Sequence, residues 1–429
     1  MKFIDKINQK LKGLSGDSKS VLTLVGGTTV AQALNFLFSP IITRQFSPEV
    51  FGDLSVFTSI TGIVGIIVCL RYELAIVLPQ DDDEGFSLFK LSLFFAFIVT
   101  TFIGIIFLFD KEIIYSIFRA DKLAAYWYYV PLTLLLTGII QSSNYWLTRT
   151  RQFTVLSWNK VVPVIVVNLV SIGLGFAGFL DIGARLFAVL ISNIANIVVI
   201  ARVVVPEFTT KKHVTKYGYK ELVKRYKNFL VYDIWGALLN NLSWMIVPIL
   251  MNAYYGSNAA GQYSIGMRVI QIPASLIGAS IGQVFLKNAS ERKYTKNLYP
   301  YTLGITKKLF MYTAPFSIII MGFGKYIFKI VFGAQWEIAG TYSQILAPWT
   351  IFWFVASPIS SVNSVLQKQN IRLIIAAINL FTRFFSLYVG KLLQNDRLGL
   401  LLFSLSGILV SLASLVSNLY YCKKNDKQQ

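Results

Sequence analysis

Three arginines lie inside long apolar segments of this chain, at Arg71, Arg268 and Arg383. A charged side chain deep in a membrane costs about 2.5–3.5 kcal/mol on insertion scales, so each guanidinium is expected to face protein or a water-filled cavity. Guanidinium groups pair phosphate oxygens bidentately, which makes anion binding one hypothesis for them. The alternative is that each arginine holds helices together through a carboxylate or through backbone carbonyls.

Two acidic side chains, Glu73 and Asp233, also fall in apolar segments. Either is a candidate proton or Na⁺ site, although a salt bridge is the favoured alternative. The candidate partners for that bridge are Arg71, Arg268 and Lys227. The apolar run over 54–78 predicts one continuous helix, in which residues two apart point to different sides. We therefore expect Arg71 and Glu73 to find separate partners.

Aromatic and amide side chains in the apolar segments are of the kind that binds sugars. Trp349 and Trp353 are four residues apart, so a helix places both indoles on one face. Their faces suit stacking on sugar rings, and packing between helices is the alternative. Asn35, Asn240 and Gln271 are polar positions that can line a cavity wall and bind hydroxyl groups. They can equally bond neighbouring helices.

The elements that must position these residues are membrane helices. The 429-residue chain is 55% hydrophobic and 14% charged, whereas soluble proteins carry about 25% charged residues. The sequence predicts an all-α integral membrane protein with twelve transmembrane helices. The predicted segments are 20–43, 54–78, 86–109, 125–147, 158–179, 185–205, 229–252, 261–286, 309–332, 340–366, 371–391 and 399–421.

The basic residues predict how the chain lies in the membrane. With the N-terminus in the cytoplasm, connections on that side hold about three times as many Lys and Arg as those on the other, which predicts that both termini are cytoplasmic. The net charge of +20 is thus interpreted as a topology signal and an attraction to anionic lipids rather than as a nucleic-acid footprint.

The chain divides into two similar halves. The predicted units are an amphipathic segment (1–19), an N-lobe of six helices (20–205), a cytoplasmic linker loop (206–228), a C-lobe of six helices (229–421) and a tail (422–429). The halves share a motif in which Pro40 matches Pro248, Gly52 matches Gly261 and Ser55 matches Ser264. Since six is an even number, both copies run the same way, and a parallel repeat with a central site between the lobes is expected.

Catalytic patterns are missing from the sequence. It has no Gly-rich phosphate loop, no paired Cys or His ligands and no extramembrane domain large enough for an ATPase. We therefore predict that the chain is not an enzyme, needs no cofactor and binds no metal for catalysis.

Four stretches resemble those of a known family. They are FGDLSVFTSITGI, RYELAIVLPQDDDE, TRTRQF and FGAQWEIAG. Their order is similar to that of the Wzx-type polysaccharide flippases, in the polysaccharide-transporter branch of the multidrug/oligosaccharidyl-lipid/polysaccharide (MOP) exporter superfamily. The resemblance implies two lobes around a V-shaped central cavity. It also implies that an undecaprenyl-pyrophosphate-linked oligosaccharide, an O-antigen, capsule or exopolysaccharide repeat unit, moves from the cytoplasmic to the outer leaflet of the bacterial inner membrane.

That substrate class gives the candidate residues their roles. Arg71, Arg268 and Arg383 would hold the pyrophosphate, and Arg44 would receive it outside unless its side chain only extends to the membrane surface. The implied partners are the lipid-linked oligosaccharide, membrane lipids, H⁺ or Na⁺, a polysaccharide polymerase and a chain-length regulator. The alternatives are a MATE-like small-molecule exporter, which would want an acidic cavity, and an O-antigen polymerase or membrane glycosyltransferase, which usually carries a large external loop.

Overall fold

The computed structural model describes residues 16–117, 119–210, 218–272 and 279–429, and in these ranges the protein is built from helices without a strand. The first half forms α2 (Gly16–Gln45), α3 (Pro48–Val64), α4 (Asp82–Ile117), α5 (Tyr129–Arg149), α6 (Phe153–Phe176) and α7 (Ile182–Thr210). The second half forms α9 (Ile234–Tyr255), α10 (Ser257–Ile270), α11 (Ala279–Arg292), α12 (Leu298–Phe332), α13 (Glu337–Ile359), α14 (Val362–Val365), α15 (Gln369–Leu392) and α16 (Asp396–Gln428). Most of the amphipathic segment predicted at 1–19 lies outside the described residues.

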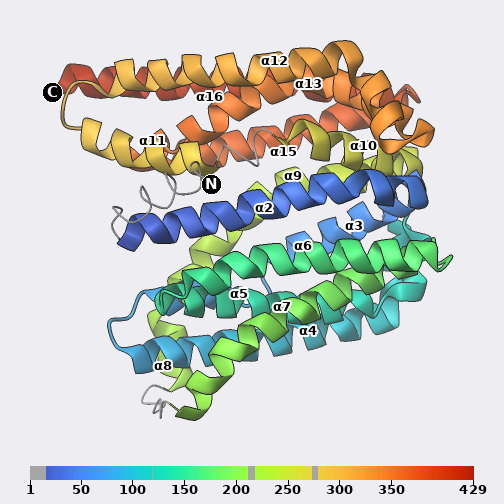
Figure 1. Ribbon diagram of the computed structural model, residues 1–429. Helices are drawn as coiled ribbons and strands as arrows, with labels where there is room; N and C mark the ends of the chain where they lie inside the picture. The colour runs from blue at the N-terminus through green and yellow to red at the C-terminus, as the bar shows by residue number, and fades with distance from the viewer. Residues whose placement is uncertain (1–15, 118, 211–217, 273–278) are drawn as a thin grey trace, which may run out of the picture.

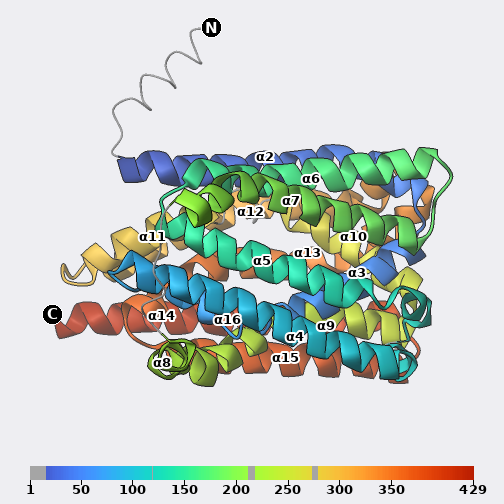
Figure 2. The ribbon, with the colours of Figure 1, turned by 90° about the horizontal axis from the view of Figure 1, so that it is seen from below.

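The long helices run side by side along one axis (Figures 1 and 2). In the described ranges, nine helices are long and apolar enough to span a membrane. The three remaining predicted crossings correspond to α3, to α5 and to α10 with α11, so the all-α membrane fold is confirmed while the count of twelve is only partly supported. Large apolar side chains such as Phe109, Phe176 and Phe381 point outward and are 78–79% exposed, as expected of a surface that faces lipid.

The two halves pack as two lobes, with α2 running between them in Figure 1. We call the end that holds Gly16 and the C-terminus the termini side, and the opposite end the hairpin side. On the hairpin side one hydrophobic cluster joins both lobes, since it contains Phe46 and Phe51 together with Met251, Trp336 and other C-lobe residues. On the termini side the described core residues form one cluster in the N-lobe and another in the C-lobe. Among the described residues, the lobes therefore share most of their common core toward the hairpin side.

The repeated motif forms the tightest contact between the lobes. A Cβ atom on Gly52 of α3 would lie 1.8 Å from the Ser257 carbonyl oxygen, and one on Gly261 of α10 would lie 1.8 Å from the Pro48 carbonyl oxygen. Only glycine allows two backbones to approach this closely. Around this contact Ser257 donates to Asp53 at 2.7 Å and Asn258 to Glu49 at 2.5 Å. The hairpin side is therefore closed.

The segment over 54–78 is not the single continuous helix that the sequence predicted. The α-helix α3 ends at Val64, and from there to Leu78 the backbone is held largely by bonds to the third residue back, including the 3₁₀ helix Tyr72–Val77. Leu70 and Arg71 have positive φ angles of 50° and 66°, which a helix does not tolerate. This change of winding alters where the side chains of Arg71 and Glu73 point.

The segment predicted as a linker loop, 206–228, is partly helical. Helix α7 continues through Pro206 to Thr210, and α8 (Tyr219–Arg225) precedes α9. Leu222 of α8 is buried in the N-lobe cluster, and Arg225 pairs with Glu84 at 2.6 Å. Helix α8 is therefore attached to the N-lobe although it follows that lobe in the sequence.

Candidate functional site

A cavity of about 350 Å³ lies inside the C-lobe, between α9, α13, α15 and α16. Four of the residues that the sequence singled out line it, namely Arg383, Trp349, Trp353 and Asn240. They come from three helices that are far apart in the sequence. The fold thus gathers the predicted guanidinium, both indoles and one amide around one space.

Arg383 is the most deeply placed charge in this cavity. It stands 14 residues after the start of α15, or about 21 Å along the helix, and only 4% of it is exposed. Its Nη1 donates to the carbonyl oxygen and, at 3.0 Å, to the hydroxyl of Ser243. It forms no ion pair in the described part of the chain. Arg383 is thus fixed in position while its charge stays unneutralised.

Aromatic rings surround that charge. The guanidinium carbon lies 4.2 Å from the centre of the Trp244 ring and 5.7 Å from that of Trp349, distances at which cation–π attraction stabilises a desolvated guanidinium. Trp353 packs against Trp244 with ring centres 5.1 Å apart. A side chain on Gly407 would collide with Trp349 at 2.5 Å. The glycine therefore makes the room that the deepest indole occupies.

The rest of the cavity wall is mainly polar, with Ala356, Ile375, Ala376 and Val410 as its apolar members, and contains no acidic residue among the described ones. Hydroxyl and amide groups line it, together with a second cation, Arg372, near the termini-side end of α15. Asn363 is 1% exposed, and neither its amide nitrogen nor its oxygen has a hydrogen-bond partner in the described structure. A buried amide of this kind normally bonds something. The wall is therefore suited to a ligand with hydroxyl groups and negative charge.

Most of the lining residues were not predicted from the sequence, and Trp244, Arg372 and Asn363 are the most informative of them. Trp244 follows Asn240 by four residues and so shares its helix face. This spacing could have predicted that Trp244 lines the same cavity as Asn240. Arg372 was counted among the charges at the membrane surface. Asn363 belongs to the short helix α14, whose packing no sequence pattern indicated.

The predicted acids lie elsewhere, in an ion-pair cluster toward the termini side. Arg71 bonds Asp233 at 2.7 Å and approaches Glu73 to 3.6 Å. The expectation that Arg71 and Glu73 point apart was wrong, because the left-handed turn and the 3₁₀ helix bring their side chains together. Since Asp233 directly precedes α9, this cluster also ties the N-lobe to the start of the C-lobe.

The remaining predicted residues take up separate positions. Asn35 accepts a hydrogen bond from Asn168 at 3.1 Å, which joins α2 to α6. Arg44 donates to the Ile330 carbonyl at 2.9 Å and so holds α2 to the end of α12. Arg268 is solvent-exposed although its neighbours in α10 are buried, and Gln271 ends the same helix three residues later. None of these lines the C-lobe cavity as described.

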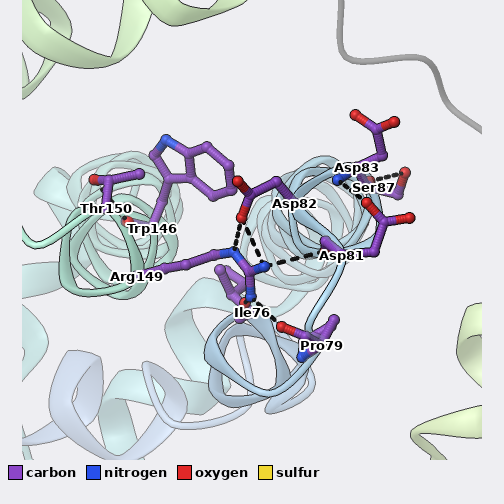
Figure 3. Close-up of polar contacts among 9 residues, drawn as sticks. All are labelled: Ile76, Pro79, Asp81, Asp82, Asp83, Ser87, Trp146, Arg149 and Thr150. Atoms are coloured by element: carbon purple, nitrogen blue, oxygen red, sulfur yellow. Dashed lines mark hydrogen bonds and ion pairs between the residues drawn. The ribbon is translucent and has the colours of Figure 1, made fainter.

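Two of the family-like stretches meet at Arg149, as Figure 3 shows. Its guanidinium donates to the carbonyls of Ile76, Pro79 and Asp81 and pairs with Asp82 at 2.8 Å. The first arginine of TRTRQF, Arg149, therefore holds the RYELAIVLPQDDDE stretch in place. The acids here organise a turn rather than a binding cavity.

The comparisons with known proteins agree with this architecture. A sequence model described as polysaccharide biosynthesis protein matches residues 41–340. The chain belongs to this family. A search of curated proteins by sequence gives no significant match.

Several solved membrane proteins share the fold of this polysaccharide biosynthesis protein. It is similar to an inward-facing multidrug resistance MATE transporter (TM-score 0.75, 15% identity, 92% of this chain and 96% of the other). It is also similar to the lipid II flippase MurJ in an inward closed conformation (TM-score 0.72, 14% identity, 93% and 89%). A third is a MOP superfamily transporter from Pyrococcus furiosus described as having a binding pocket of reverse polarity (TM-score 0.65, 13% identity, 95% and 96%). These likenesses show the fold, which is that of a multi-pass membrane protein.

Proposed function

We propose that the protein is a flippase that moves an undecaprenyl-pyrophosphate-linked oligosaccharide, such as an O-antigen, capsule or exopolysaccharide repeat unit, across the bacterial inner membrane. The observation that carries this proposal is the C-lobe cavity, in which Arg383 and three indoles share a wall with hydroxyl and amide groups and no described acid. Membership of a polysaccharide biosynthesis family supports a glycan as the cargo.

Each part of such a substrate has a matching part of the protein. Trp349 and Trp353 offer ring faces to sugars, while Asn240 and its polar neighbours offer hydrogen bonds. Arg383 and the exposed Arg268 offer guanidinium groups to the pyrophosphate. The polyprenyl tail remains in lipid, next to the apolar outer surface.

Transport then follows from the arrangement of the lobes. The charge bias places the termini side in the cytoplasm, so the hairpin-side closure faces outward. The substrate headgroup enters between the lobes from the inner leaflet, and rocking of the lobes re-exposes it on the outer side. The close Gly52–Gly261 contact lies at this closure, so it must separate when the lobes open to the outer side.

The coupling role for Glu73 and Asp233 remains a proposal, as do H⁺ or Na⁺ and the polymerase and chain-length regulator as partners. Because both acids contact Arg71, an ion would have to compete with that guanidinium for them. A MATE-like exporter of cations is less favoured, because the lining of the cavity is basic. A polymerase or glycosyltransferase is less favoured because the hairpin-side connections are short.

Replacement of Arg383 tests the proposal. We expect Arg383→Gln to lower export of surface glycan about ten- to hundredfold, because a hydrogen bond to a charged group contributes about 1.5–3 kcal/mol. The lipid-linked intermediate should accumulate in the inner leaflet. This is measured by labelling the glycan with a membrane-impermeant reagent that reaches only one side of the membrane. Trp353→Ala should also lower export.

Two matched controls accompany these variants. Arg397→Gln removes an arginine near the start of α16, outside the cavity, and Trp158→Ala removes an indole that is 54% exposed on α6. Both should export normally. Normal glycan export by Arg383→Gln, at wild-type protein levels in the membrane, would contradict the proposed role of the cavity.

A further inference from the structure

One amide in the C-lobe cavity is left without a partner. Asn363 of α14 lines the cavity and is 1% exposed, and neither its Nδ2 nor its Oδ1 atom has a hydrogen-bond partner in the described structure. Its backbone is fixed on both sides, because its N–H donates to the Ser360 carbonyl at 3.1 Å and its carbonyl accepts from the Lys368 N–H at 2.7 Å. The preceding residue, Val362, is buried in the C-lobe cluster. The fold therefore holds this amide at the cavity and leaves its hydrogen bonds to something else.

The chemistry of that amide limits what its partner is. A side-chain amide presents a donor, Nδ2, and an acceptor, Oδ1, side by side, and burying both unpaired is unfavourable. An ionised carboxylate or phosphate satisfies only the donor. A cation is unsuitable, because the same wall carries the guanidinium groups of Arg372 and Arg383 and no described acid. Two adjacent hydroxyl groups of a sugar ring satisfy both atoms at once, since one hydroxyl oxygen accepts from Nδ2 while its neighbour donates to Oδ1.

The surroundings of the amide suit one sugar ring. The cavity volume of about 350 Å³ is at the lower end of the range of about 300–1,000 Å³ for small-molecule sites, so the cavity holds a small part of the cargo rather than the whole oligosaccharide. Ala356, Val410 and the indole of Trp353 offer apolar surface in the same wall, which suits the C–H face of a pyranose. The wall thus matches both the apolar face and the polar edge of one ring.

We propose that Asn363 is a specificity-determining residue that binds two adjacent hydroxyl groups on one pyranose of the cargo. This inference deepens the proposed function and rests on it for the presence of a glycan. In a pyranose linked through carbon 1, the ring hydroxyl groups on carbons 2, 3 and 4 form two adjacent pairs. Both pairs include the hydroxyl group on carbon 3, so this group is the one that Asn363 must recognise.

The test compares two cargo lipids that differ at that carbon, polyprenyl diphosphate glucose and polyprenyl diphosphate 3-deoxyglucose. The purified full-length protein is reconstituted in liposomes, and a soluble pyrophosphatase cleaves only the radiolabelled lipid that has reached the outside. We expect the wild type to move the glucose lipid about tenfold faster, because the deoxy lipid leaves the amide with an unmade hydrogen bond. Asn363→Leu should move both lipids at the slower rate.

Asn196→Leu is the matched control. Asn196 of α7 is also a buried amide, 6% exposed and with its Oδ1 atom unpaired among the described residues, but it belongs to the N-lobe and lies outside the cavity. This variant should keep the preference for the glucose lipid. The melting temperature separates recognition from structure, since Asn363→Leu replaces an unpaired buried amide by an apolar group of similar size and should melt at or above the temperature of the wild type.

Binding gives a readout that does not need transport. Trp349 and Trp353 line the same cavity, so a sugar bound there should change the tryptophan fluorescence of the protein. Methyl glucoside should do so in the wild type at about tenfold lower concentration than methyl 3-deoxyglucoside. Asn363→Leu should not discriminate between the two glycosides.

Equal transport of the two lipids by the wild type, or a preference that survives in Asn363→Leu, overturns the inference, and the amide of Asn363 then bonds only water. A marked fall in the melting temperature of Asn363→Leu overturns it as well, because the amide is then structural. Equal transport leaves the proposed function standing, since both lipids are still moved. Preferential binding of methyl glucoside by a protein that moves neither lipid would instead keep the sugar site and reject the proposed cargo.

Discussion

The charge on Arg71 is balanced by the protein itself, unlike that on Arg383. Glu73 is 1% exposed and has one oxygen without a partner, and the guanidinium 3.6 Å away is its ion-pair partner among the described residues. Asp233 has a side chain that is 45% exposed and can be hydrated instead. Of the two acids, Glu73 depends more on Arg71.

Removal of Arg71 should therefore destabilise the protein, because the buried Glu73 carboxylate loses its counter-charge. We expect Arg71→Gln to lower the free energy of unfolding by about 1–3 kcal/mol, measured by denaturant titration in detergent. The double variant Arg71→Gln with Glu73→Gln should recover most of this loss, because the neutral amide needs no counter-charge. Arg397→Gln serves as the control, and a double variant no more stable than Arg71→Gln would disprove the dependence.

Composition was enough to predict which residues carry unusual charge, but not how each charge is compensated. Arg383 and Trp349 were recognisable because a cation and an indole in deep apolar segments need a reason to be there. The pairing of Arg71 with Glu73 was missed, since it depends on two positive φ angles that no residue type signalled. Arg185 was counted with the surface charges because only the packed structure brings Phe46 and Phe51 onto it.

Among the helices, α3 and α10 show how the repeat in the sequence becomes a contact in space. Ser55 bonds the Gly52 carbonyl at 2.7 Å, and Ser264 bonds the Gly261 carbonyl at 2.9 Å, so the two copies have the same local geometry. That the two segments are copies of one motif was recognisable from the spacing of Pro, Gly and Ser. That the two copies pack directly on each other was not, because a repeat in sequence fixes the shape of each copy and not the distance between them.

Adding one methyl group to either glycine should force the hairpin side apart. In Gly52→Ala or Gly261→Ala the new Cβ meets a backbone oxygen, which cannot rotate away as a side chain does. We expect strongly reduced glycan export and faster labelling, by a membrane-impermeant thiol reagent, of a cysteine introduced at Ser257. Gly322→Ala in α12, where nothing lies within 4 Å of the new atom, should leave both unchanged. If the glycine variants are labelled as slowly as the protein that carries only the cysteine at position 257, the Gly52–Gly261 contact does not hold the hairpin side closed.

At the scale of the whole molecule, the lobes are joined strongly at one end and separately packed at the other. The described termini-side clusters each belong mainly to one lobe. The Arg71–Asp233 pair crosses between the halves, and Phe229 and Leu230 at the start of the second half pack against the N-lobe cluster. Two-lobed organisation followed from the even number of predicted helices and the repeat. The closure of the hairpin side could not be predicted, since no sequence pattern specifies which of several conformations is the most stable.

Linking the hairpin side covalently should stop transport. Asp53→Cys with Ser257→Cys, in a chain whose buried Cys69 and Cys422 are replaced by Ala, places two thiols where a hydrogen bond now joins the lobes. We expect a short reversible bifunctional thiol reagent to abolish export and reduction to restore it. Each single cysteine variant should be insensitive to the reagent. Undiminished export by the linked protein would mean that this end does not open.

In the proposed cycle the glycine contact has a second consequence: while it stays closed, it is the point about which the termini side opens to admit the substrate, and it separates only in the later step that releases the substrate. Helix α2 has 30 residues and is about 45 Å long. A small rotation about its hairpin-side end therefore moves its termini-side end by a large distance. A turn of about 15°, the scale known for rigid-body transitions of subunits, sweeps the distant tip through about 12 Å. Two residues without side chains can thereby convert a slight tilt into a displacement wider than a helix, and no turn of backbone needs to unwind for it.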